Sequence, residues 1–270
     1  MRFLQQKFKA ALRSARFRRR QVCLELFAGK GHVAAAWRRS GFATIAFEID
    51  LNAGYDLLVP EVLRLIRGWV SSHCVSCVWL GTPCTSWSRA RRGPPGSNWC
   101  RIRSDAHLDG MPGLSDRDLE RVRIGNATAR VSQQIIACCV ANQVPCALEN
   151  PCTSMLWDSR YLRHLRKRAC CQEFLLDLCQ YGVRWRKATR VCAWHCLVSP
   201  ALTLRCHAHD NLCSKTSLPH IRLSGADKVS GVLWTRRAQE YPRRFASAAA
   251  RLLMDSAESH SLRNLYRLAI

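Results

Sequence analysis

The sequence predicts an α/β fold, a mostly parallel sheet with helices on both faces, and three observations lead to this prediction. Short apolar runs that suit buried strands alternate with stretches whose apolar residues fall at helical spacing. Glycine and proline separate many of these segments. Strand, helix, strand, helix and strand follow one another within residues 22–80, an order typical of βαβ units, whose strands lie parallel.

The first half of the chain supplies three expected strands and two expected helices. We expect strands at residues 22–27, 42–47 and 75–80, with helices beginning near Val33 and Val62. The third strand ends abruptly at Gly-Thr-Pro, because proline fixes its own φ and has no amide donor. A cysteine follows that proline at once.

The second half begins with a long irregular stretch. Residues 88–117 contain two Gly/Pro clusters, and a loop of this length inside a compact domain is usually functional or disordered. Ser115 can then cap a long helix, with Leu119, Val122 and Val131 on one face. The remaining expected elements are this helix to about residue 142, a strand at 144–148, a helix around 154–168, a strand around 173–178 and a terminal helical segment at 234–253.

We divide the chain into three parts. A basic N-terminal arm covers residues 1–20, which contain eight Lys or Arg and no acid. The central domain covers 21–191, and a Cys/His-rich and basic segment covers 192–270, which can belong to the same domain. The arm suits nucleic-acid binding, nuclear import, organelle transit or a disordered tail equally well, and the sequence does not choose among them.

Charge is the most distinctive feature of the composition. The 270 residues include 42 Lys+Arg against 19 Asp+Glu, a net charge of +23. This excess predicts a polyanionic partner, with nucleic acid first, although charge can also serve solubility alone. Hydrophobic residues make up 48% of the chain, but no run approaches the ~18 apolar residues of a membrane span. We expect no membrane partner, and no oligomeric state is predicted.

The sixteen cysteines bear on the compartment. The first twenty residues are basic and lack the apolar core of a secretory signal. We therefore expect an intracellular protein with reduced thiols, which makes catalytic or metal roles more natural than disulfides.

Four chemically distinctive features lie at successive strand ends. They are a Gly-x-Gly turn at Gly29 and Gly31, an acid at Glu48, a thiol at Cys84 and a second acid at Glu149. Open α/β sheets bind their ligands at these carboxyl ends. The turn lets a cofactor approach the backbone, and Glu48 can bind a ribose diol, as in dinucleotide and S-adenosylmethionine (SAM) sites. Because the full G-x-G-x-x-G is missing, the pattern favours SAM over NAD.

The same residues resemble the DNA (cytosine-5) methyltransferase family. Six short stretches are similar to that family's motifs and fall in its order: Leu26 to Gly31, Ala46 to Asp50, Tyr55 to Leu57, Pro83-Cys84, Glu149 to Pro151, and Tyr181 to Arg190. They span residues 22–191. The chain thus resembles a divergent, compact branch, which implies a Rossmann-like SAM-dependent methyltransferase fold.

The resemblance implies a role for each matching residue. Cys84 would be the nucleophile, and Glu149 would donate a hydrogen bond or proton near ring nitrogen 3 of the base. Arg186 or Arg190 would hold the base oxygen or a phosphate. The SAM site would be formed by Phe27, Gly29, Gly31, Glu48 and Asp56.

The implied activity is transfer of a methyl group from SAM to carbon 5 of cytosine in DNA, through a covalent cysteine adduct. We expect the protein in the nucleus or another DNA-containing compartment. One alternative is the same chemistry on RNA. Another is a catalytically inactive nucleic-acid-binding protein, which is favoured by Thr85 in place of the family's Gln and by an irregular arginine motif with Trp185 and an apparent one-residue insertion. An amino-methyltransferase would need an Asx-Pro-Pro-aromatic stretch where this chain has Thr82-Pro83-Cys84-Thr85.

A base must leave its stack to reach the thiol, so a mobile basic loop is expected beside the site. Residues 88–117 suit this role, with Arg89, Arg91 and Arg92 placed to meet phosphate. Too few residues follow Arg190 for a full target-recognition domain, which predicts low sequence selectivity or selectivity supplied elsewhere.

A second group of cysteine and histidine residues crowds into residues 192–220. A structural zinc would use four of them, but their spacing matches no standard finger. We therefore prefer buried or surface thiols to a zinc site. The best zinc candidates are Cys196, Cys206, Cys213 and His220.

Overall fold

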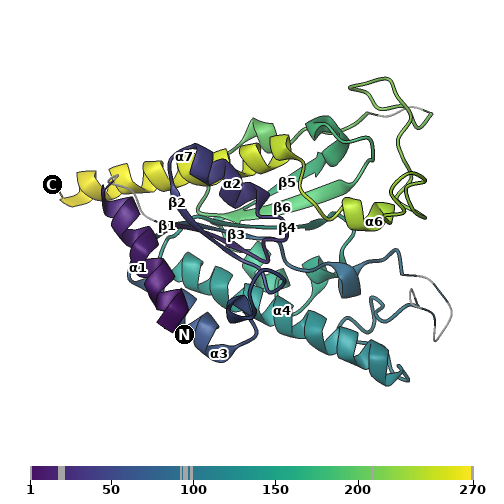
Figure 1. Ribbon diagram of the computed structural model, residues 1–270, viewed down its shortest axis with the longest axis horizontal. Coiled ribbons are helices and arrows are strands. Elements are labelled where there is room, and N and C mark those ends of the chain that lie inside the picture. Colours follow the sequence, from purple (N-terminus) through teal and green to yellow (C-terminus); the bar gives the residue numbers. More distant parts are fainter. Residues whose placement is uncertain are drawn as a thin grey trace.

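The computed structural model describes residues 2–17, 22–91, 93, 97, 100–207 and 210–268, with side chains for all of these except 16–17 and 261–268. Its centre is a six-stranded sheet in the order β2-β1-β3-β4-β6-β5 (Figure 1). The strands are β1 (Val22–Leu26), β2 (Ala43–Phe47), β3 (Val75–Leu80), β4 (Cys146–Pro151), β5 (Cys171–Asp177) and β6 (Ala188–Trp194). The α-helices are α1 (Arg2–Phe17), α2 (His32–Arg39), α3 (Pro60–Ser71), α4 (Asp116–Ala141), α5 (Arg163–Arg166), α6 (Trp234–Arg237) and α7 (Arg243–Leu268).

The sheet is mostly parallel. β2, β1, β3 and β4 pair in parallel, whereas β6 runs antiparallel to both of its neighbours, β4 and β5. The predicted α/β class with a mostly parallel sheet is therefore confirmed. The carboxyl ends of four neighbouring parallel strands meet at one edge of the sheet, which places their following loops side by side.

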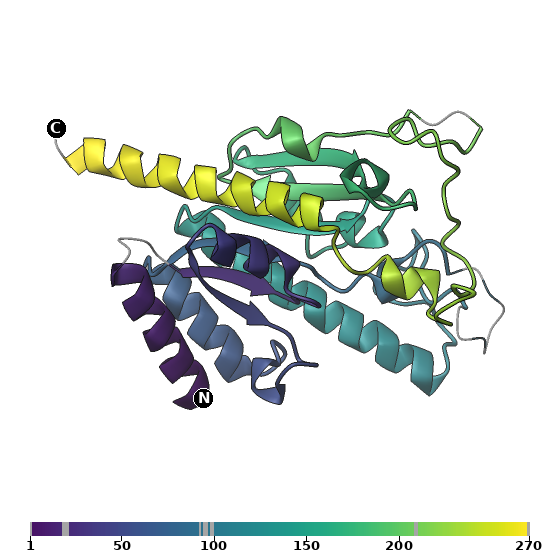
Figure 2. The same cartoon turned by 45° about the horizontal axis from the view of Figure 1, so that its top comes forward.

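Helices cover both faces of the sheet (Figures 1 and 2). All six residues of β3 are buried, and alternate side chains point to opposite faces. Val78 and Leu80 pack in the core under α1, α3 and α4, while Cys77 and Trp79 pack in the core under α2 and α7. Because this strand is buried on both sides, its sequence is a nearly continuous apolar run and does not alternate between apolar and polar residues.

The first helix is part of the core. Leu4 and Phe8 are buried, and the Phe8 ring stacks on Trp69 of α3 with centroids 3.8 Å apart. Most of the expected N-terminal arm is thus a packed amphipathic helix, and Arg18, Arg19 and Arg20 lie outside the described residues. The exposed side of α1 remains basic.

Several elements differ from the sequence-based expectation. The helix expected at 154–168 is broken into a 3-10 turn, Met155–Asp158, and the short α5. Leu119 lies on the exposed side of α4, although Val122 and Val131 are buried as expected. The strand β6 was not anticipated, and it contains the expected domain boundary at 191/192. The terminal helical segment expected at 234–253 is divided into α6 and α7. Pro242 lies just before α7, and its ring and missing amide donor prevent a helix from continuing through it from the preceding residues.

Among the described residues, no helix combines the length and the apolar character that crossing a membrane requires.

Candidate active site

A cavity of about 730 Å³ opens at the carboxyl ends of the parallel strands. Its walls come from the loops after β1, β2 and β3, from the end of β4, and from the segments before β6 and α7. Of the residues predicted from sequence, Phe27, Gly29, Glu48, Asp56, Cys84 and Glu149 all line it. Residues from motifs that are far apart in the chain therefore meet at one cavity.

The Gly-x-Gly turn forms one wall. Gly29 and Gly31 have φ values of 53° and 67°, a left-handed conformation that glycine adopts without strain. The Gly29 amide donates a 2.7 Å hydrogen bond to Oε2 of Glu48, so the acid after β2 is held against the turn after β1. A Cβ built on Gly29 would meet no atom within 4 Å, which leaves open space beside this backbone. Gly31 begins α2 behind the turn and is not among the residues that line the cavity.

A buried acid supports that turn from below. Glu25 on β1 has no exposed surface, and its Oε2 accepts a 2.6 Å hydrogen bond from the Ala34 amide in the first turn of α2. Burial raises the pKa of Glu25 to about 7, although the amides of Ala34 and Val33 act in the opposite direction. Its Oε1 has no hydrogen-bond partner among the described residues. Glu25 was not among the residues predicted from the sequence.

The loop that carries Cys84 is fixed by its neighbours. The Asn150 side chain donates a 2.7 Å hydrogen bond to the carbonyl of Thr82, and the hydroxyls of Thr82 and Ser132 lie 2.7 Å apart. A Cβ on Gly81 would lie 2.8 Å from the Phe27 carbonyl oxygen, so only glycine fits there. Asn150, which follows the predicted acid, thus positions the predicted nucleophile.

Cys84 lies in the cavity beside the acid Glu149 and the cation Lys187. The thiol is half-buried, and burial raises its pKa, while the nearby Lys187 lowers it and Glu149 raises it. Glu149 is 5% exposed, and its Oε1 lies 3.5 Å from Nζ of Lys187. A cation at this distance neutralises the acid and favours a thiolate beside it.

Tyr241, from the segment before α7, completes this group. Its hydroxyl donates a 2.9 Å hydrogen bond to Oε2 of Glu149. Burial and the neighbouring Glu149 hold the pKa of Tyr241 well above its usual range, which keeps the hydroxyl protonated as a donor. The Tyr241 carbonyl lies 2.5 Å from Nδ1 of His32 at the start of α2. No motif in the sequence pointed to this tyrosine.

The two predicted arginines lie elsewhere. Nε of Arg186 donates to Asp177 at 3.3 Å, and Nε of Arg190 lies 3.7 Å from Glu173. Neither lines the cavity, and Lys187 supplies the cationic side chain that acts on Cys84 instead. The sequence did contain one sign that these arginines would point away from the cavity, which is the apparent one-residue insertion in the arginine motif. A shift of one residue along an extended chain turns a side chain to the other face.

The expected phosphate-binding arginines are paired. Arg89 makes two hydrogen bonds to Asp105, at 2.8 and 2.5 Å, and Arg91 lies 3.9 Å from Asp118. Arg92 lies outside the described residues. Arg89 or Arg91 could therefore meet a phosphate only by exchanging a carboxylate for it.

The chain after Cys84 is anchored to α4 through a buried arginine. Arg103 is 1% exposed, its guanidinium lies 3.5 Å from the Trp87 ring centre, and it donates to the Ser86 carbonyl at 3.1 Å. Burial lowers the pKa of Arg103 to about 10. A Cβ on Gly125 would lie 2.0 Å from the Ser86 hydroxyl oxygen. Gly125 makes room for this contact because it has no side chain.

The zinc candidates divide. Cys206, Cys213 and His220 come together, but Cys196 does not join them, since its Sγ lies 3.3 Å from the Trp194 carbonyl under α7. The fourth member of the group is Cys179, in the turn Leu178–Tyr181 after β5. The structure thus brings together three of the four candidates and adds Cys179, which is distant in sequence from the other three.

Comparisons with known proteins find partial structural similarity to solved structures. Neither a protein-family model nor a curated protein matches the chain. Similar solved structures include a mutant DNMT2 of Spodoptera frugiperda (19% identity, TM-score 0.33), the Entamoeba histolytica methyltransferase EhMeth (9%, 0.37) and the S. pombe Dnmt2 methyltransferase (15%, 0.36). Each similarity covers 64% of this chain and about half of the other, at 49%, 52% and 50%. At these scores the similarities carry no argument, and the proposals below stand on the chain's own geometry.

Proposed function

We propose that this protein transfers a methyl group from SAM to carbon 5 of cytosine in a nucleic acid, with DNA as the first candidate. The observation that carries the proposal is the convergence of Cys84, Glu149 and Lys187 on one cavity with the Gly29 turn and Glu48. A nucleophile, an acid partner and a cofactor cradle are the parts that this chemistry needs.

The residues present fit a nucleoside cofactor. The backbone at Gly29 is open toward the cavity, and the carboxylates of Glu48 and Asp56 line it. Glu48 would bind the ribose hydroxyls of SAM, Asp56 would meet its adenine, and Phe27 would line the same pocket. When bound there, SAM supplies an electrophilic methyl group.

The chain's own side chains activate the base. The Cys84 thiolate adds to carbon 6 of cytosine, forming a carbon–sulfur bond, and the electron pair of the ring double bond moves to carbon 5. Lys187 favours the thiolate. Glu149, whose Oε2 accepts a hydrogen bond from Tyr241, would take up a proton and in that form donate to ring nitrogen 3. After carbon 5 takes the methyl group, it loses its proton to water. The carbon–sulfur bond then breaks and restores the thiolate.

The net charge of +23 supports a nucleic-acid substrate, since phosphate neutralisation by Lys and Arg drives such binding. The charge serves DNA and RNA equally. An experiment that offers the protein DNA and RNA in parallel is therefore needed to decide between them.

Trapping the covalent adduct tests the proposal. The protein is incubated with SAM and DNA that contains 5-fluorocytosine, and in parallel with the matching RNA. Fluorine at carbon 5 blocks the final elimination, so a working thiol stays bonded to the base. We expect a denaturation-resistant adduct on DNA that disappears in Cys84→Ala.

A different result would contradict each part of the proposal: the DNA substrate, the enzymatic activity and the cofactor site. An adduct on RNA alone would overturn the DNA assignment but keep the chemistry. If neither polymer is trapped by the folded protein while nucleic acid still binds, the enzyme assignment fails and the inactive binding protein takes its place. A separate measurement of SAM binding by calorimetry, with Glu48→Ala as the comparison, tests the cofactor site independently of methyl transfer.

A further inference from the structure

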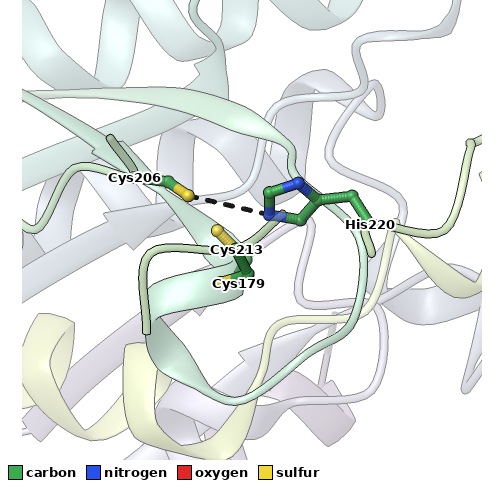
Figure 3. A group of neighbouring side chains, drawn as sticks. All are labelled: Cys179, Cys206, Cys213 and His220. Carbon is green, nitrogen blue, oxygen red and sulfur yellow. Dashed lines mark hydrogen bonds between the residues drawn. The ribbon is translucent and has the colours of Figure 1, made fainter. Parts of the chain in front are cut away.

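A second cluster of reactive side chains lies outside the cavity described above. Cys179, Cys206, Cys213 and His220 each offer one ligand atom, and these four atoms all lie within 4.8 Å of one another (Figure 3). All four side chains are buried, and none lines the cavity. We propose that they form a structural zinc site with three cysteine ligands and one histidine ligand.

The spacing of the ligand atoms is close to that of a tetrahedral zinc site. Zn–S bonds of about 2.3 Å and Zn–N bonds of about 2.0–2.1 Å place neighbouring ligand atoms roughly 3.5–3.8 Å apart. Sγ of Cys206 and Nε2 of His220 already lie 3.7 Å apart (Figure 3). Small side-chain rotations would bring the remaining pairs to this separation. Four ligands also match the closed coordination of structural rather than catalytic zinc.

The polar groups around the sulfurs suit thiolate ligands. The Ser214 amide donates to Sγ of Cys206 at 3.5 Å, and the Ser214 hydroxyl does so at 3.6 Å. Nε2 of Gln180 lies 3.5 Å from Sγ of Cys179 and 3.7 Å from Sγ of Cys213. Donors that converge on several sulfurs stabilise negative charge there, as the outer partners of metal ligands commonly do.

The local backbone presents the ligands as a compact unit. Cys213 lies in a tight turn, since its amide donates to the Leu218 carbonyl at 2.9 Å and its carbonyl accepts from the Ser217 amide at 2.8 Å. The His220 amide then returns to the Asn211 carbonyl at 2.9 Å. The structure assigns no helix or strand to the described residues 203–233, and a segment so poor in regular structure gains most from a metal.

Zinc at this point would join three parts of the molecule. Cys179 follows β5, and the Cys206 amide donates to the buried Asp177 at the end of that strand, at 2.9 Å. Just after His220, the Ile221 amide donates to the Arg184 carbonyl at 2.9 Å. Arg184 lies three residues before Lys187, so the metal would steady the segment that delivers Lys187 to Glu149. The metal site itself does not depend on the proposed methyl transfer.

The metal content of the purified full chain is the first test. We expect about one zinc per chain by elemental mass spectrometry. Replacement with Co²⁺ should give the visible d–d bands and the sulfur-to-metal charge-transfer band of a tetrahedral thiolate site. Chelation should lower the melting temperature of the protein, and added zinc should restore it.

Matched variants separate this site from its neighbours. Cys179→Ser, Cys213→Ser and His220→Ala should each lose most of the zinc. The controls Cys196→Ser and His207→Ala, a buried cysteine outside the cluster and an exposed histidine beside it, should keep it. Because the loss variants could simply unfold, His220→Cys provides a second readout: it exchanges one zinc ligand for another and should retain the metal and show a changed charge-transfer spectrum with Co²⁺.

Three results would overturn the proposal. The first is a folded wild-type chain that neither contains nor takes up zinc or cobalt. The second is a disulfide between two of the three cysteines in protein purified under air-free, reductant-free conditions. The third is zinc that Cys179→Ser retains and Cys196→Ser loses, which would move the metal to a different set of ligands.

Discussion

At the scale of single residues, Lys187 and Cys84 form the pair on which the proposed chemistry depends. A thiol is a weak nucleophile until it loses its proton, and burial raises the pKa of Cys84. Lys187 is the nearby group that lowers this pKa most, and it also pairs with Glu149 at 3.5 Å. One cation therefore acts on both partners.

Lys187→Gln should raise the pKa of Cys84 further, because the lowering by the ammonium group is lost while burial remains. At a fixed neutral pH, alkylation of Cys84 by iodoacetamide should slow several-fold, and its pH profile should move upward. Peptide mass spectrometry measures this rate at the single residue. Arg186→Gln removes the neighbouring cation, which pairs with Asp177 instead, and should leave the profile in place. Equal shifts in both variants would mean that net charge, not contact, controls the thiol.

Glu25 gives a pH-dependent stability with a defined sign. Burial raises the pKa of this acid from 4.5 to about 7 in the folded chain, so folding is penalised once the carboxyl must ionise. This loss of unfolding free energy is absent below pH 4.5 and grows as the pH rises to about 7. Above that pH it reaches about 3 kcal/mol, because a change of one pKa unit corresponds to about 1.36 kcal/mol.

Glu25→Gln should remove this penalty, because its amide oxygen can still accept from the Ala34 amide. The variant should match the wild type in unfolding free energy near pH 4.5 and exceed it by up to about 3 kcal/mol at pH 8. Denaturant titrations at the two pH values measure the difference. A gap that stays constant with pH would show that Glu25 does not titrate in this range.

At the scale of elements, the loop after β3 and the helix α4 are held together by close contact. Gly125 faces Ser86 and Arg103, and the Arg103 guanidinium lies on the Trp87 ring. This contact fixes the chain on the carboxyl side of Cys84, just as Asn150 fixes it on the amino side. The nucleophile is thus positioned from two elements.

Gly125→Ala should destabilise the protein by about 2 kcal/mol or more, because the new methyl group would lie 2.0 Å from the Ser86 hydroxyl oxygen. Gly68→Ala in α3 is the matched control: its methyl group meets no atom within 4 Å, and it should stabilise the helix by roughly 0.5–1 kcal/mol. Thermal unfolding of the two variants should move in opposite directions. Similar shifts would contradict the close packing at Gly125.

The elements of the parallel half could be predicted because each shows a strong local signal. The β3 run is apolar apart from Ser76 and ends at Gly81-Thr82-Pro83. Ser115 caps α4 as expected and accepts a hydrogen bond from the Asp118 amide. β6 was missed because it follows a basic stretch and shows no clear alternation, its last four residues all being buried. Its antiparallel pairing is a long-range choice that local sequence does not encode.

The site could be predicted only as far as its motifs reach. Cys84, Glu48 and Asp56 come after strands, and Glu149 lies near the end of β4, so their convergence followed from topology. The position of Lys187 in the cavity, where the arginines were expected, depends on a one-residue shift in register. The positions of Tyr241 and Cys179 depend on which distant segments fold against the sheet. Apart from the apparent insertion in the arginine motif, none of these leaves a local pattern in the chain.

At the scale of the whole molecule, charge and core share the first helix. α1 buries Leu4 and Phe8 under the sheet, whereas Lys9 and Arg13 are exposed on its other side. An arm that served only as a disordered tail would not need the apolar side. The packing indicates that the helix belongs to the fold, and its basic side is free to serve the polyanion that the net charge of +23 predicts.

Two sets of substitutions should separate these roles. Phe8→Ala removes the ring that stacks on Trp69 and should cost about 3–5 kcal/mol of unfolding free energy. The double change Lys9→Gln with Arg13→Gln should leave stability within about 0.5 kcal/mol. If both side chains contact phosphates, it should also lower the slope of log affinity against log salt by about two for duplex DNA. Fluorescence anisotropy over a salt series measures this slope. An unchanged slope in the double variant would assign the basic side of α1 to solvation, and the nucleic acid would then have to meet the cations around the cavity instead.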